Sequence, residues 1–198
     1  MTRVMARLMK ELPNMITLLR VVLSCLLNFY ILNQFGSLPI PMVIFLLIVL
    51  TDFLDGKIAR FYGNTSLFGA VFDIVADLFY MVTSYIVLCS FHVLPLWFLF
   101  IMLFKFIEFV VTSFFLKEPC SGKSIFVFDF IGRFTAVFFY IIPILVYASF
   151  QLSQLLYFFT IHIFLYIITF MVFVSSFQRL WNCVELTFTS KSENMTLG

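Results

Sequence analysis

Charged residues are scarce in this sequence of 198 residues. Lys, Arg, Asp and Glu make up 11% of it, whereas 63% is hydrophobic and the mean hydropathy is +1.12. Because a soluble globular domain has about 25% charged residues, this scarcity excludes an ordinary soluble fold. The formal net charge of +2 also provides no strongly basic surface for nucleic acid. The composition therefore predicts an integral membrane protein without a nucleic-acid partner.

Cysteine and histidine are also rare, and they are poorly placed for binding a metal. The four cysteines, Cys25, Cys89, Cys120 and Cys183, are far apart and form no C-x-x-C motif, and no histidine stands at metal-ligand spacing. Zinc sites need closely spaced Cys or His ligands. We therefore expect free thiols that pack within helices.

Long apolar runs are what the sequence has in abundance. Six of them approach the roughly 20 residues that a spanning helix needs, with approximate limits 14–34, 39–61, 67–91, 94–116, 125–149 and 154–178. The predicted fold is all-α and polytopic, with six transmembrane helices after a short juxtamembrane amphipathic helix over 1–12. We expect 1–186 to form a single membrane domain and the polar segment 187–198 to be a disordered tail.

Lysine and arginine are absent from one set of predicted connections. The links NQFGSLPIP, FHVLP and SFQLSQ contain neither residue, whereas both terminal segments, the end of the second span and the link after the fourth span contain them. Basic residues stay on the cytoplasmic side of a membrane. Both termini and the links after the second and fourth spans are therefore predicted to be cytoplasmic.

Aspartate is concentrated inside two of the apolar runs. Asp52 and Asp55 are three residues apart in the second run, and Asp73 and Asp77 are four apart in the third. Each spacing places the pair on one helix face, and the short linker FYGNTS makes the two helices antiparallel neighbours whose pairs can face each other. Four carboxylates this close cannot all stay ionised without cations. Their oxygens suit Mg²⁺ or Mn²⁺, and two such ions roughly 3.5–4 Å apart can promote phosphoryl transfer.

The acids also have simpler explanations. They could neutralise Lys57 and Arg60, or cap helices at the membrane interface. However, charges inside a membrane are costly and indicate function by default, and four of them at helical spacing favour a site. Small residues support this interpretation, because Gly56, Ala59 and Gly69 on the same helices allow close approach of a helix or ligand.

The segment DFLDGKIARFYGNTSLFGAVFDIVAD resembles the signature of the CDP-alcohol phosphatidyltransferases, D-x-x-D-G-x-x-A-R-x8-G-x-x-x-D-x-x-x-D. Every fixed position is filled, by Asp52, Asp55, Gly56, Ala59, Arg60, Gly69, Asp73 and Asp77. The first span is similar to the family's N-x-x-T-x-x-R motif, with Asn14, Thr17 and Arg20. GRFTAVFFY is similar to the family's Gly-Lys motif on the fifth helix, with Arg133 in place of lysine. Six helices with both termini inside is also the family's plan, so the resemblance covers essentially the whole chain.

The resemblance implies a reaction in which the hydroxyl of a small polar alcohol attacks CDP-diacylglycerol, CMP leaves and a phospholipid forms. It implies two divalent ions, Mg²⁺ or Mn²⁺, held by Asp52, Asp55, Asp73 and Asp77. Asp77 would also take the proton from the attacking hydroxyl. The nucleotide and diphosphate would be bound by Asn14, Thr17, Asp55, Gly56, Ala59, Arg60 and Gly69. The family also implies a homodimer with one complete site per chain.

The sequence defines the acceptor alcohol less well. Lys105, Arg133 and Arg179 are candidates for binding an acceptor phosphate, although Lys105 is also spaced to pair with Glu108 and Arg179 could anchor a helix end. Across the last two aspartates, family members that use glycerol phosphate commonly have the motif D-P-x-A-D-K, whereas this chain has DIVADL. Before the third aspartate, this chain has FGAVFD, which is similar to the FGAVLD of inositol-type members. We favour a sugar-alcohol phosphate, either glycerol 3-phosphate or an inositol phosphate, over free inositol, serine or another amino alcohol.

Two other classes of protein are alternatives. In a divalent-cation transporter the aspartates would form the transport site, but transporters favour inverted repeats and this chain has no second copy of the acidic pattern. In a non-catalytic scaffold the complete signature would have no purpose. We therefore predict a multi-pass membrane enzyme with a cytoplasmic active site.

Overall fold

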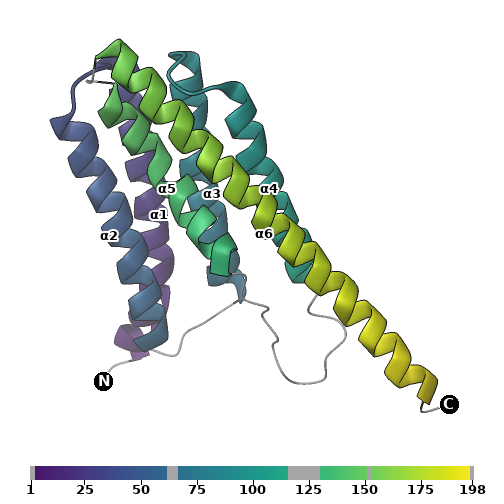
Figure 1. Cartoon of the computed structure of the whole chain (residues 1–198). Coiled ribbons are helices and arrows are strands. Elements are labelled where there is room, and N and C mark those ends of the chain that lie inside the picture. The colour runs from purple at the N-terminus through teal and green to yellow at the C-terminus, as the bar shows by residue number, and fades with distance from the viewer. Residues whose placement is uncertain (1–2, 62–66, 116–129, 151–152, 197–198) are drawn as a thin grey trace. The chain divides into compact units, whose positions relative to one another are not determined.

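The computed structural model describes residues 3–61, 67–115, 130–150 and 153–196, and within these ranges it contains helices and short connections but no strand. The six helices of the described ranges follow one another as α1 (Arg3–Asn33), α2 (Pro39–Phe61), α3 (Leu67–Ser90), α4 (Leu96–Phe115), α5 (Phe130–Ser149) and α6 (Gln154–Thr196) (Figure 1). Each helix covers one of the apolar runs, so the prediction of an all-α fold is confirmed.

Three segments of the described chain are long and apolar enough to cross a membrane: Asn14–Asn33, Val71–Ser90 and Leu156–Trp181. Pro39–Leu54 and Phe134–Ser149 are shorter apolar helices. Many large apolar side chains are exposed on the outside of these helices. Soluble monomers rarely expose apolar patches of this size. The chain is therefore an integral membrane protein, and its arrangement in six spans stays a prediction.

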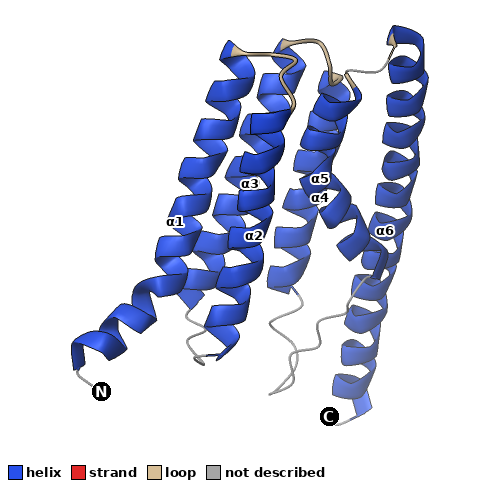
Figure 2. Cartoon of the chain, turned by 90° about the vertical axis from the view of Figure 1, so that its left-hand side faces the viewer, coloured by secondary structure: helices blue, strands red, loops and turns tan. Residues whose placement is uncertain are grey.

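The helices divide into two compact units, each of which is described by itself. The first unit contains Met1–Leu94 and Ile142–Gln154, and the second contains Pro95–Ile141 and Leu155–Gly198. The boundary falls inside α5 beside Pro143, which lacks an N–H for the helical hydrogen bond. Within the first unit, α1 packs against both α2 and α3, and Figure 2 shows the three helices side by side. The first helix therefore connects the two helices that carry the aspartates.

Both terminal helices are longer than the sequence predicts. α1 includes the expected juxtamembrane helix over 1–12 as its first turns, which bend away from the rest of the helix (Figure 2). Pro13 lies in this part of the helix and accounts for a bend, because proline lacks the N–H that an intrahelical hydrogen bond needs. α6 continues to Thr196, through most of the tail 187–198 that we expect to be disordered. Extending an existing helix fixes one residue for each hydrogen bond gained, which costs less than starting one. The single domain over 1–186 stays a prediction.

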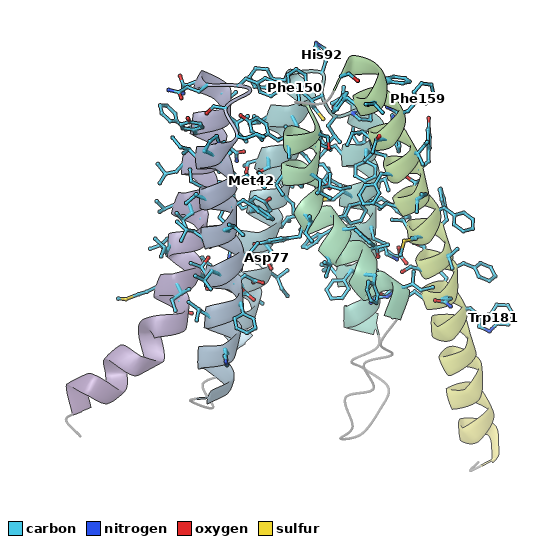
Figure 3. All side chains as sticks on the ribbon, turned by 60° about the vertical axis from the view of Figure 1, so that its left-hand side comes forward. Met42, Asp77, His92, Phe150, Phe159 and Trp181 are labelled. Atoms are coloured by element: carbon cyan, nitrogen blue, oxygen red, sulfur yellow. The ribbon has the colours of Figure 1, made fainter. Side chains whose placement is uncertain are left out.

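An aromatic cluster closes one end of the first unit. The ring of Phe35, in the link between α1 and α2, stacks on Phe91 at 4.2 Å between centroids. The Tyr147 hydroxyl accepts a hydrogen bond from the backbone N–H of Gly36 at 3.1 Å and donates to the carbonyl of Ser37 at 3.0 Å. Figure 3 shows Phe150 and His92 at this end and Asp77 well away from it, toward the opposite end of the unit. The cluster therefore ties the helices together far from the acidic residues.

Candidate active site

The acidic site of the first unit is organised around one buried arginine. Arg20 on α1 has 0% of its side chain exposed. Its Nη1 donates to Oδ1 of Asp73 at 2.7 Å and to Oδ1 of Asp77 at 2.6 Å, and its Nη2 lies 3.1 Å from Oδ1 of Asp52. Because Asp52 is on α2 and the other two are on α3, a single guanidinium joins three helices. We call Arg20 and these three aspartates the acid cluster.

The geometry of the acid cluster follows from spacing and helix packing. Asp73 and Asp77 lie four residues apart, so α3 presents both on one face. The exposed fractions of the aspartate side chains are 42% for Asp52, 38% for Asp73 and 29% for Asp77. The guanidinium therefore approaches the carboxylates from the protein interior, while each carboxylate keeps an accessible side. The structure thus brings together three of the four aspartates that the sequence expects to meet.

The three carboxylates form a set of ligands that could hold a metal ion. Each offers one oxygen, and these oxygens lie within 4.8 Å of one another. Hard divalent cations prefer carboxylate oxygens, and like charges at this separation need a cation nearby. The chemistry of the donor set therefore fits a divalent metal ion.

Five other predicted residues lie outside the described side chains. The backbone of α2 is helical over Asp55, Gly56, Ala59 and Arg60, and that of α5 is helical over Arg133. The surroundings of these five residues are not part of the described structure. Their roles in binding metal, nucleotide or acceptor stay predictions.

The remaining predicted nucleotide-binding residues lie on the same helices as the acid cluster. Asn14 is half-buried and Thr17 is buried on α1. Thr17 precedes Arg20 by three residues, and Gly69 on α3 precedes Asp73 by four, so each lies one turn from the cluster along its own helix. This placement is compatible with a ligand that reaches the carboxylates.

Lys105, a candidate for acceptor binding, belongs to a buried polar group in the second unit. Its Nζ donates to Oε2 of Glu108 at 3.2 Å and to Oγ of Ser176 at 3.2 Å. The Ser176 hydroxyl itself donates to the same Glu108 oxygen. The alternative that pairs Lys105 with Glu108 is therefore confirmed, and α6 contributes the third member.

Arg179 on α6 also makes polar and aromatic contacts within the second unit. Its Nη1 donates to Oγ1 of Thr112 at 3.0 Å, and its guanidinium carbon lies 4.9 Å from the ring centroid of Phe109. Both partners are on α4, and a cation over an aromatic face is attracted by the ring quadrupole. Two residues further on, the exposed Trp181 points away from α6 (Figure 3). Arg179 therefore braces α6 against α4, whatever else it binds.

Sequence reasoning missed the roles of Arg20 and Ser176. Arg20 entered only as the last residue of the N-x-x-T-x-x-R similarity, although an arginine inside an apolar run is itself a signal of a specific partner. Ser176 carries no such signal, because serines are common in membrane helices.

Comparison with known proteins places these features in a family. Residues 10–174 match the family model of the CDP-alcohol phosphatidyltransferases. The chain is 36% identical over 95 residues to a probable cardiolipin synthase (CMP-forming) of Drosophila melanogaster. The aligned region covers 48% of the chain and 29% of that protein. It is 41% identical over 71 residues to the CDP-diacylglycerol–glycerol-3-phosphate 3-phosphatidyltransferase of Rickettsia typhi, over 35% of the chain and 39% of the relative.

A relative of the same name from Aquifex aeolicus is 30% identical over 133 residues, which is 65% of the chain and 70% of that protein. The chain spans well under half of the length of the Drosophila and Rickettsia relatives. Because the family model covers most of the sequence, including all of the acid cluster, the chain belongs to the CDP-alcohol phosphatidyltransferase family.

Proposed function

We propose that this protein transfers a phosphatidyl group from CDP-diacylglycerol to the hydroxyl of a small polar alcohol and releases CMP, in phospholipid biosynthesis. The observation that carries the proposal is the acid cluster, in which three carboxylates from two helices offer oxygens within 4.8 Å of one another. The names of the relatives from Rickettsia typhi and Aquifex aeolicus support this donor and this transfer.

The proposed roles follow the family signature. Asp52, Asp55, Asp73 and Asp77 would hold two divalent ions, Mg²⁺ or Mn²⁺, which would supply positive charge for the diphosphate and for the departing CMP. Asp77 would also accept the proton of the attacking hydroxyl, and 29% of its side chain is exposed, so a substrate hydroxyl can reach it. The cytidine and diphosphate are bound by Asn14, Thr17, Asp55, Gly56, Ala59, Arg60 and Gly69.

We propose a sugar-alcohol phosphate as the acceptor, with glycerol 3-phosphate favoured by the names of the relatives. Lys105, Arg133 and Arg179 would bind its phosphate, since charge-assisted hydrogen bonds to phosphate are strong. The ammonium group of Lys105 already donates to Glu108 and Ser176. An acceptor phosphate would therefore bind Lys105 alongside these two partners. Arg179 contacts Thr112 through Nη1, and a guanidinium has further N–H groups to donate.

The direct test of the function is acceptor-dependent release of CMP. The purified protein in lipid, supplied with CDP-diacylglycerol and Mg²⁺ or Mn²⁺, should release CMP fastest with glycerol 3-phosphate or an inositol phosphate, and not at all in EDTA. Free inositol, serine and other amino alcohols serve as comparison acceptors. Absence of CMP release with every acceptor would refute the enzyme, and uptake of Mn²⁺ into sealed vesicles would then favour the transporter alternative.

We also propose six spans, with both termini and the active site on the cytoplasmic side. The links NQFGSLPIP, FHVLP and SFQLSQ contain no lysine or arginine, whereas both terminal segments, the end of the second span and the link after the fourth span do. In a cysteine-free background, single cysteines at 35–38 and 150–153 should react with a membrane-impermeant maleimide from outside. Single cysteines at 61–66 should react only after the membrane is opened. Labelling of 61–66 from outside would contradict both the orientation and the cytoplasmic site.

We further propose a homodimer with one complete site per chain. Phe100 and Phe104 lie four residues apart on α4, with 66% and 60% of their surface exposed, and form an aromatic face suited to packing against another helix. Mass measurement in native lipid nanodiscs should find two chains per particle, and Phe100→Ala together with Phe104→Ala should shift the population toward one. A particle with one chain and full activity would exclude the dimer.

A further inference from the structure

Arg20 is a fully buried cation inside a segment long and apolar enough to cross a membrane. It lies within Asn14–Asn33 of α1 and has no exposed surface. A guanidinium stays protonated in proteins, and a buried charge is tolerated only when it is paired and hydrogen-bonded. All three of its described acidic partners come from α2 and α3. Arg20 therefore relies on these three aspartates as charge partners.

The contacts of Arg20 leave the carboxylates able to bind a second cation. The described ion pairs of Arg20 are made through Oδ1 of each aspartate, and a carboxylate can accept through both of its oxygens. The arginine is on the buried side, while between 29% and 42% of each aspartate side chain is exposed. Among the described side chains of this cluster, one guanidinium faces three carboxylates, so the acidic groups outnumber the cation. The acid cluster is thus assembled but still attractive to a divalent ion.

We propose that Arg20 is a positioning residue, an internal counter-cation that holds Asp52, Asp73 and Asp77 together before a divalent ion binds. Without it, carboxylates from α2 and α3 would repel one another at the separation that metal binding needs. With it, the fold of the first unit is independent of metal, and the ligands are already in place when the ion arrives. The inference rests on the proposed function, because the ion concerned is the one that the reaction uses.

The test compares how strongly metal stabilises variants of Arg20. The full chain in lipid nanodiscs is melted in EDTA and in Mn²⁺, and Mn²⁺ binding is measured separately by electron paramagnetic resonance. Arg20→Gln should melt at a lower temperature in EDTA and recover much of the loss in Mn²⁺, because the ion replaces the missing cation. The Mn²⁺-induced shift should therefore be roughly twofold or more that of the unsubstituted protein.

Two further variants separate positioning from ordinary stabilisation. Lys105→Gln removes another buried cation, one paired with Glu108 in the second unit, and should lower the midpoint equally in EDTA and in Mn²⁺. Arg20→Lys keeps the charge but loses the planar fork, so its Mn²⁺-induced shift should lie between those of Arg20→Gln and the unsubstituted protein. If Arg20→Gln does not fold in EDTA although it folds in Mn²⁺, that result also supports the proposal.

Two outcomes would overturn the inference, and only the second would also contradict the proposed function. Equal Mn²⁺-induced shifts in Arg20→Gln, Arg20→Lys and the unsubstituted protein would make Arg20 an ordinary structural ion pair and leave the proposed function intact. Failure of the unsubstituted protein to bind Mn²⁺ would remove the metal from the proposed function and the inference with it.

Discussion

Turnover of the Asp77→Asn variant is expected to fall by roughly 10²–10⁴-fold, the range typical of losing a general base. Asparagine keeps an oxygen that can accept the hydrogen bond that Arg20 now donates to Asp77 at 2.6 Å, so the helices should stay packed and CDP-diacylglycerol should still bind. An amide cannot take the proton of the attacking hydroxyl. The measurements are turnover and CDP-lipid affinity across a Mn²⁺ titration, with the thermal midpoint as a check of the fold.

The titration distinguishes proton transfer from metal coordination at Asp77. If Asp77 is the base, turnover stays low at saturating Mn²⁺ while binding of the CDP-lipid is largely retained. Near-native turnover at saturating Mn²⁺ would show that Asp77 is not the base. Loss of CDP-lipid binding that Mn²⁺ restores together with turnover would assign it to coordination alone.

Asp52→Asn should instead weaken binding of metal and nucleotide together. Asp52 is the most exposed of the three described aspartates, with 42% of its side chain accessible, and it is the one that α2 contributes to the acid cluster. Removing a partner that only orients a ligand typically costs 10–100-fold in metal affinity, so we expect a loss of roughly tenfold or more for a direct ligand. High Mn²⁺ should restore part of the activity, because the remaining carboxylates still attract the ion.

The two substitutions are matched controls for each other. Both convert a carboxylate to an amide beside the same Arg20, on α2 for Asp52→Asn and on α3 for Asp77→Asn. Mn²⁺ affinity, measured directly by electron paramagnetic resonance, should fall more for Asp52→Asn than for Asp77→Asn. An unchanged Mn²⁺ affinity in Asp52→Asn would remove Asp52 from the ligand set.

Local features of the sequence were sufficient to predict where the described helices lie, although not the full length of α1 and α6. An α-helix forms through hydrogen bonds between residues four apart, and an apolar stretch is visible in contiguous residues. The second run, predicted over 39–61, coincides with α2 at Pro39–Phe61, and the third, over 67–91, with α3 at Leu67–Ser90. The i, i+4 spacing likewise placed Asp73 and Asp77 on one face, and the eight positions of the signature indicated the family. These properties depend on neighbours along the chain, which the sequence displays directly.

The partners of the buried charges were decided by tertiary structure. Arg20 meets Asp73 and Asp77 across 53 and 57 residues of sequence, and Ser176 joins Glu108 across 68. Helical spacing shows which residues share a face, but it does not show which face of another helix lies opposite. That choice depends on how α1 packs against both α2 and α3. The sequence alone therefore determined the helices, the paired aspartates and the family, whereas only the packed structure placed a buried arginine among the acids, because long-range pairing is a property of the packing between helices.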